Sequence, residues 1–149
     1  NKMSLQDELL DDMKTAMKNK DKEKVSVIRM ARAAIKDAAI DERKDLSDDE
    51  VIEVLAKLIK QNKESLAGFE KAERPEEVEK LKREIDIIEE YLPEQLSENE
   101  LEDIVTETIA EVGAEDMSDM GQVMGAIMPK VKGKADGSEV NQLVREKLQ

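Results

Sequence analysis

The sequence contains no cysteine and no histidine, and these two absences exclude several kinds of chemistry. Without cysteine the chain has no disulfide, no thiol nucleophile and no cysteine metal site. Without histidine it lacks the commonest general base and the commonest metal ligand at neutral pH. No apolar run reaches the roughly 18 residues that a membrane-spanning helix needs, so we expect no membrane association.

Aromatic residues, proline and glycine are also scarce. The 149 residues include one Phe, one Tyr, no Trp, three prolines and six glycines. The hydrophobic residues are mainly aliphatic, and charged residues make up 41% of the chain. This composition predicts an all-α protein with an aliphatic core, built as one domain or two small ones.

The start of the chain is charged and does not resemble a secretory signal peptide, so we expect a cytoplasmic protein. Asn1 and Lys2 precede the first methionine, Met3. We interpret these two residues as a cloning remnant and leave them out of the fold prediction.

Five helix starts can be predicted from capping residues. A side-chain oxygen at the N-cap accepts a hydrogen bond from an otherwise unpaired backbone N–H, and the carboxylate of an acid three residues later accepts one from the N–H of the N-cap residue. Proline also suits the first helical position. The predicted caps are Ser4, Asp21, Ser47 with Glu50, Arg74 before Pro75, and Ser97 with Glu100.

Apolar residues at helical spacing predict four helices before residue 93. Their faces are Leu5, Leu9, Met13, Met17; Ile28, Ala31, Ile35, Ala38; Leu55, Ile59, Asn62, Leu66, Phe69; and Val78, Leu81, Ile85, Ile88, Leu92. The last two faces alternate steps of four and three, which predicts a long antiparallel hairpin over 47–92 with the first two helices at its base. Asn62 is interpreted as a polar contact that sets the register of this hairpin.

The segment Leu92-Pro93-Glu94-Gln95-Leu96 interrupts the helical pattern. We therefore predict an N-terminal helical hairpin domain at 1–92, a linker at 93–96 and a small three-helix domain at 97–149. The first helix of this tail is expected to stop at Gly113, and the second to be interrupted at Pro129. Asp136 or Ser138 is expected to cap the third.

The formal net charge of −13 is distributed unevenly. Residues 14–36 contain eight basic and two acidic residues, whereas residues 97–119 contain nine acids and no base. The last 30 residues, 120–149, contain five bases and three acids. The two basic zones are candidate contacts for a polyanion, and the alternative is that they are solvated helix faces.

Within the second basic zone, Lys130, Lys132 and Lys134 flank Gly133 in a stretch with the character of a loop. The first zone provides a secondary basic patch of Lys14, Lys18, Lys22, Arg29 and Arg32. The glycines do not match the spacing of a phosphate-binding loop. Gly121 and Gly125 are four residues apart, and we predict that they allow close packing against a neighbouring helix. The alternative is a smooth surface for a nucleic acid or a partner helix.

The acids suggest no active site, because nearly all of them lie opposite the apolar faces of the predicted helices. We therefore predict no catalytic residue, no metal site and no cofactor, and a chain that is not an enzyme by itself.

Several blocks of the sequence resemble known families. Gly121-Gln122-Val123-Met124, Lys132-Gly133-Lys134-Ala135-Asp136, Val140-Asn141-Gln142-Leu143 and Arg145-Glu146-Lys147-Leu148 resemble the tail of GatB, a subunit of tRNA-dependent amidotransferase. The wider chain resembles the YqeY family of small bacterial proteins through Ser26-Val27-Ile28-Arg29-Met30, residues 91–96, residues 117–121 and Met128-Pro129-Lys130-Val131-Lys132-Gly133. Between Met124 and Lys132 this chain is about one helical turn longer than GatB tails.

The resemblance implies a helical tail that contacts tRNA, with Lys130, Lys132, Gly133, Lys134, Asn141 and Arg145 as candidate nucleic-acid-binding residues. The catalytic domain of GatB has no counterpart here. A family label of carbon–nitrogen ligase with glutamine as amido donor would then describe the GatB complex. We expect a non-catalytic module that binds tRNA or a tRNA-dependent enzyme, and the alternative is a protein–protein interaction adaptor.

Overall fold

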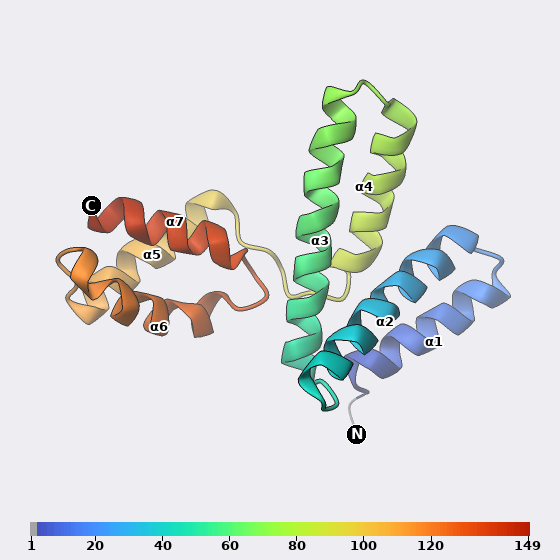
Figure 1. The fold of residues 1–149 in the computed structure, drawn as a ribbon, viewed down its shortest axis with the longest axis horizontal. Coiled ribbons are helices and arrows are strands. Elements are labelled where there is room, and N and C mark those ends of the chain that lie inside the picture. Colours follow the sequence, from blue (N-terminus) through green and yellow to red (C-terminus); the bar gives the residue numbers. More distant parts are fainter. Residues whose placement is uncertain (1–2) are drawn as a thin grey trace. The chain divides into compact units, whose positions relative to one another are not determined.

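A computed structural model describes residues 3–149, so Asn1 and Lys2 lie outside the described residues. Within this range the chain forms seven α-helices and one short 3₁₀ helix, with no strand (Figure 1). The predicted all-α fold class is confirmed. The chain divides into two compact units, one ending at Leu92 and the other running from Pro93 to Gln149.

Unit 1 contains α1 (Leu5–Lys18), α2 (Lys22–Glu42), α3 (Asp48–Lys71) and α4 (Pro75–Glu89). The predicted caps Ser4, Asp21 and Ser47 each accept a backbone hydrogen bond at the start of their helix, and Pro75 is the first residue of α4. Helices α1, α2 and α3 therefore begin at a side-chain cap, whereas α4 begins at a proline and Arg74 makes no cap hydrogen bond.

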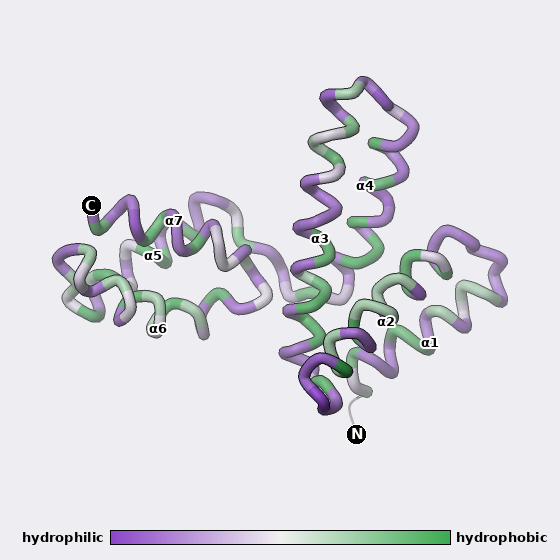
Figure 2. The backbone as a smooth tube through the Cα atoms, in the orientation of Figure 1, coloured by the Kyte–Doolittle hydropathy of each residue, from purple (hydrophilic) through white to green (hydrophobic). Residues whose placement is uncertain are grey.

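Helix α2 packs against α1, α3 and α4. Helices α3 and α4 lie side by side and are joined by the turn at 72–74 (Figure 1). Hydrophobic residues follow the facing sides of the helices (Figure 2). The shared core is aliphatic and includes Val27, Ile28, Ala31 and Ile35 of α2.

Two details of the predicted apolar faces are wrong. Met17 is 51% exposed, and Ala16 is buried in its place, because the buried stripe of α1 steps by four and then three from Leu9 through Met13 to Ala16. Asn62 is half-buried, but its Nδ2 atom has no hydrogen-bond partner among the described residues. The polar contact expected of Asn62 is therefore not formed through this amide.

Unit 2 contains α5 (Glu98–Val112), the 3₁₀ helix η1 (Met117–Asp119), α6 (Met120–Val131) and α7 (Gly137–Leu148). The three α-helices pack against one another around a valine-rich core. Ser97 caps α5, Gly113 ends it in the left-handed conformation with φ +70, and Asp136 caps α7.

Contrary to expectation, α6 is not interrupted at Pro129 and continues to Val131. A proline at this position removes one backbone hydrogen bond, the one that would reach the carbonyl of Gly125. Ile127 and Val131, on either side of Pro129, are fully buried. Burial of these two side chains offsets the lost bond so close to the helix end.

The predicted linker, 93–96, is attached to unit 2. The N–H of Leu96 donates to the carbonyl of Lys134 at 2.9 Å, and Nε2 of Gln95 donates to the carbonyl of Gly133 at 2.7 Å. Leu96 also packs against the core of this unit. Residues 93–96 therefore belong to the structure of the tail.

Replacing Asn62 with Leu should raise the free energy of unfolding by about 1 kcal/mol, because a buried amide without a partner is replaced by an apolar group. Urea denaturation monitored by circular dichroism measures this difference. Gln61→Leu, at the neighbouring exposed position, is the matched control and should change stability little. A less stable Asn62→Leu protein would show that the amide has a favourable partner.

The carboxyl of Glu50 should make the stability of the folded chain depend on pH. The Lys44 ammonium, at 2.8 Å, and then the N–H and hydroxyl of Ser47 lower the pKa of Glu50 from 4.5 to about 2. A carboxyl with a depressed folded-state pKa contributes stability above its unfolded pKa and loses it as the pH falls through the folded value. The Tm difference between wild type and Glu50→Gln should therefore be full at neutral pH and shrink between pH 4.5 and about 2. A constant difference across this window, or the same behaviour in the control Asp49→Asn, would contradict the assignment.

Candidate nucleic-acid interface

Lys130 is the first of the candidate tail lysines, and its ammonium is held within unit 2. Its Nζ lies 2.6 Å from Oε2 of Glu111 and donates to Oγ1 of Thr108 at 3.1 Å. Thr108 is fully buried on α5, and its hydroxyl donates to the carbonyl of Ile104 at 2.7 Å. Lys130 thus links α6 to α5, and its charge is balanced by a carboxylate.

Gly133 and Lys134 form the joint between α6 and α7. Gly133 is buried with φ +75, a backbone conformation that favours glycine, and its carbonyl accepts the Gln95 bond. Lys132 and Lys134 flank it with exposed side chains. The backbone of this joint binds residues 93–96. Its glycine is therefore explained by a structural role.

Asn141 and Arg145 lie on one face of α7, where Nη2 of Arg145 donates to Oδ1 of Asn141 at 3.4 Å. Lys147 pairs with Glu102 of α5 at 3.3 Å. The structure therefore brings Asn141 and Arg145 together, whereas Lys130 is directed to α5. The six candidate tail residues are distributed over α6, the joint and α7.

The prediction that Gly121 and Gly125 allow close helix packing is wrong within the described chain. Both glycines are exposed, and a Cβ atom added at either one would meet nothing within 4 Å. They lie on the outer face of α6, because Val123 and Ile127 occupy its buried face. The surviving interpretation is an outward surface that has few side chains.

The secondary basic patch separates into two groups in the structure. Lys14 lies in the second half of α1 and Lys18 is its last residue, Lys20 lies in the turn, and Lys22 and Lys24 lie in the first turn of α2. We call these five residues the turn lysines. Among residues 3–149, no carboxylate lies within 4 Å of their ammonium groups. The second group, Arg29 and Arg32 together with Lys36, lines a groove between α1 and α2 and is called the groove cations.

Helix stability does not explain the positions of all the turn lysines. Cations at the end of α1 are favoured by the helix dipole, but cations at the start of α2 are disfavoured by it. Lys22 and Lys24 occupy that unfavourable end, and Lys20 adopts φ +59 beside them. The concentration of positive charge at this turn therefore has no evident structural purpose.

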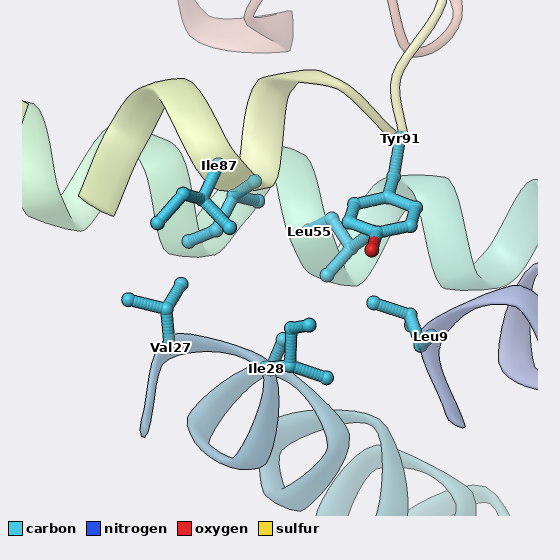
Figure 3. A pocket seen from close by; sticks show the side chains of 8 residues that line it. Leu9, Val27, Ile28, Leu55, Ile87 and Tyr91 are labelled. Atoms are coloured by element: carbon cyan, nitrogen blue, oxygen red, sulfur yellow. The ribbon is translucent and has the colours of Figure 1, made fainter. Parts of the chain in front are cut away.

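One hollow in the interior of unit 1 is filled mainly by apolar side chains. The hollow in Figure 3 is lined by residues such as Leu9, Val27, Ile28 and Leu55, and it is a packed part of the core. Tyr91 lies at its edge, and its hydroxyl donates to Oδ2 of Asp12. Burial, and then the Asp12 carboxylate, raises the pKa of Tyr91, so that this phenol stays protonated at neutral pH. In the described chain no three acidic residues are grouped in a way that could hold a metal ion.

No helix in the described range is both long and apolar enough to cross a bilayer.

The chain belongs to the YqeY family, because the family model described as "Yqey-like protein" matches residues 6–148. Similar proteins include one from Kluyveromyces lactis, 43% identical over 84 residues, which are 56% of this chain and 45% of that protein. A second, from Pyrenophora tritici-repentis, is 30% identical over 130 residues, which are 86% of this chain and 71% of that protein. Both are named "Altered inheritance of mitochondria protein 41, mitochondrial".

The match spans less than half the length of the Kluyveromyces protein. These relatives are fungal proteins with mitochondrial names, whereas the sequence resemblance implied a bacterial protein. The comparisons establish membership of the family, and the names of the relatives describe a phenotype and a compartment of those proteins.

Gly121→Ala and Gly125→Ala should each raise the free energy of unfolding by about 0.5–1 kcal/mol, because Ala favours a helix and the added methyl meets open space. Thermal and urea denaturation of the full chain measure the change. Gly113→Ala is the control and should destabilise by about 1 kcal/mol, since its left-handed backbone strains a Cβ. Loss of stability at 121 or 125 would restore the close-packing interpretation.

Proposed function

We propose that this member of the YqeY family is a non-catalytic accessory module that binds tRNA or a similarly folded RNA. The turn lysines are the observation that supports this proposal most strongly. Five ammonium groups lie within eleven residues at one end of the α1–α2 pair, and the described chain supplies no carboxylate within 4 Å of them. A phosphate backbone neutralises such charges and releases counterions, which favours binding.

The tail has a smaller part in this proposal. The resemblance of the tail to that of GatB suggests tRNA as the RNA, and Lys132, Lys134 and Arg145 have exposed side chains. Lys130 is already paired with Glu111, so we assign it to the stability of unit 2. The nine acids of residues 97–119 would repel a phosphate backbone from most of α5.

A protein-binding adaptor is the second candidate function. The groove between α1 and α2 favours it, because that surface combines cations with apolar side chains. The two functions use different residues of unit 1, and they can therefore be tested separately.

The triple variant Lys18→Glu/Lys20→Glu/Lys22→Glu should weaken binding of bulk tRNA by at least about tenfold at low salt and reduce the dependence of Kd on salt. Native gel shifts across a salt series measure both quantities. The control Lys57→Glu/Lys71→Glu/Lys80→Glu changes net charge equally on α3 and α4, and it should weaken binding only a few-fold. Equal losses of tRNA affinity in the two variants would mean that net charge alone causes the binding, and this would contradict the turn lysines as the site. Absence of salt-dependent tRNA binding by the wild-type chain would refute the proposal.

A further inference from the structure

A groove of about 640 Å³ runs between α1 and α2 and is closed by the segment before α3. Nε2 of Gln6 donates to the carbonyl of Leu46 at 3.2 Å, which fastens that segment to α1. Along α2 the lining extends from Arg29 to Ala39, a length of about 15 Å for ten residue steps. This elongated form suits a segment of about three helical turns.

One side of the groove is positively charged. Arg29, Arg32 and Lys36 follow α2 at intervals of three and four residues, so they form one row. Among residues 3–149, no carboxylate lies within 4 Å of these cations, and Nη1 of Arg32 instead contacts Sδ of Met13 at 3.8 Å. The row therefore presents positive charge to whatever enters the groove.

Apolar side chains also line the groove. Leu10, Ala33 and Ala39 line it, and the small side chain of Ala33 leaves space for a close approach. An apolar stripe on a protein partner would cover these side chains, whereas an RNA phosphate backbone would leave them uncovered.

The groove also limits the position of acidic side chains on such a partner. Asp7 of α1 and Asp45 of the segment before α3 are part of the lining, and both would repel carboxylates. A partner must therefore place its acids on the flank that faces α2. A uniformly acidic segment would be disfavoured, and this repulsion provides specificity.

We propose that the groove between α1 and α2 binds an amphipathic helix of a protein partner, with an apolar stripe over Ala33 and a row of Asp or Glu facing Arg29, Arg32 and Lys36. This site is separate from the turn lysines, and it does not depend on RNA binding.

Fluorescence anisotropy of the full chain with a labelled 18-residue helical peptide tests the proposal. The peptide has Leu at i, i+3, i+4 and i+7 repeats, Glu on one flank and Gln on the other, and its scrambled form has the same composition. The designed peptide should bind with a Kd on the order of 10 µM, and the scrambled peptide about tenfold more weakly. Equal affinity for the two peptides would mean that charge alone attracts them and would overturn the proposal.

Variants of the chain locate the site. Arg29→Glu/Lys36→Glu should weaken peptide binding by about tenfold or more, and Ala33→Gln, which enlarges a lining side chain without changing charge, should also weaken it. Lys57→Glu/Lys71→Glu has the same charge change elsewhere and should leave affinity within about twofold. Circular dichroism melts establish that each variant is folded.

Retained peptide affinity in Arg29→Glu/Lys36→Glu would refute the groove as the site. The proposal would also fail if this variant lost tRNA binding and left peptide binding unchanged, because the groove would then be an RNA contact. Weaker peptide binding with unchanged tRNA binding would support the groove and leave the turn lysines as a separate question.

Discussion

Burial of one face of α2 is the constraint on which unit 1 depends. Val27, Ile28, Ala31 and Ile35 form that face and pack among α1, α3 and α4. A helix rotates by about 100° per residue, so burial of these positions directs Arg29, Met30, Lys36 and Ile40 outward. The same packing that stabilises the unit therefore determines which cations are available for binding.

Unit 2 uses its polar residues differently. Lys130 and Lys147 reach carboxylates on α5, and the joint at Gly133 and Lys134 accepts two hydrogen bonds from residues 93–96. Lys130 and Lys147 thus link helices within the unit. In unit 1 the turn lysines and groove cations have no such partners in the described part of the chain. This contrast leads us to place the proposed binding surfaces on α1 and α2.

The sequence predicted the features that arise from local interactions. Helix starts at Ser4, Asp21, Ser47 and Ser97 depend on a cap and its next three residues, and they are found where expected. The continuation of α6 past Pro129 could not be predicted in this way, because it depends on tertiary burial of Ile127 and Val131. The open surroundings of Gly121 and Gly125 likewise depend on where the other helices lie.

The candidate site was predictable only as a distribution of charge. The excess of lysine and arginine in residues 14–36 was visible, but its division into turn lysines and groove cations needs the packing of α1 on α2. The pairing of Lys130 with Glu111 is also a contact between helices. One local signal was available for the groove: Arg29, Arg32 and Lys36 recur at intervals of three and four residues.

We propose that the turn lysines form the RNA-binding surface of this protein. Lysine footprinting tests it most directly, by measuring the acylation rate of each lysine in the full chain with and without bulk tRNA. We expect tRNA to slow the modification of the five turn lysines, including Lys24, and to leave that of Lys57 and Lys71 unchanged. Protection confined to Lys132 and Lys134, or uniform across all lysines, would contradict it.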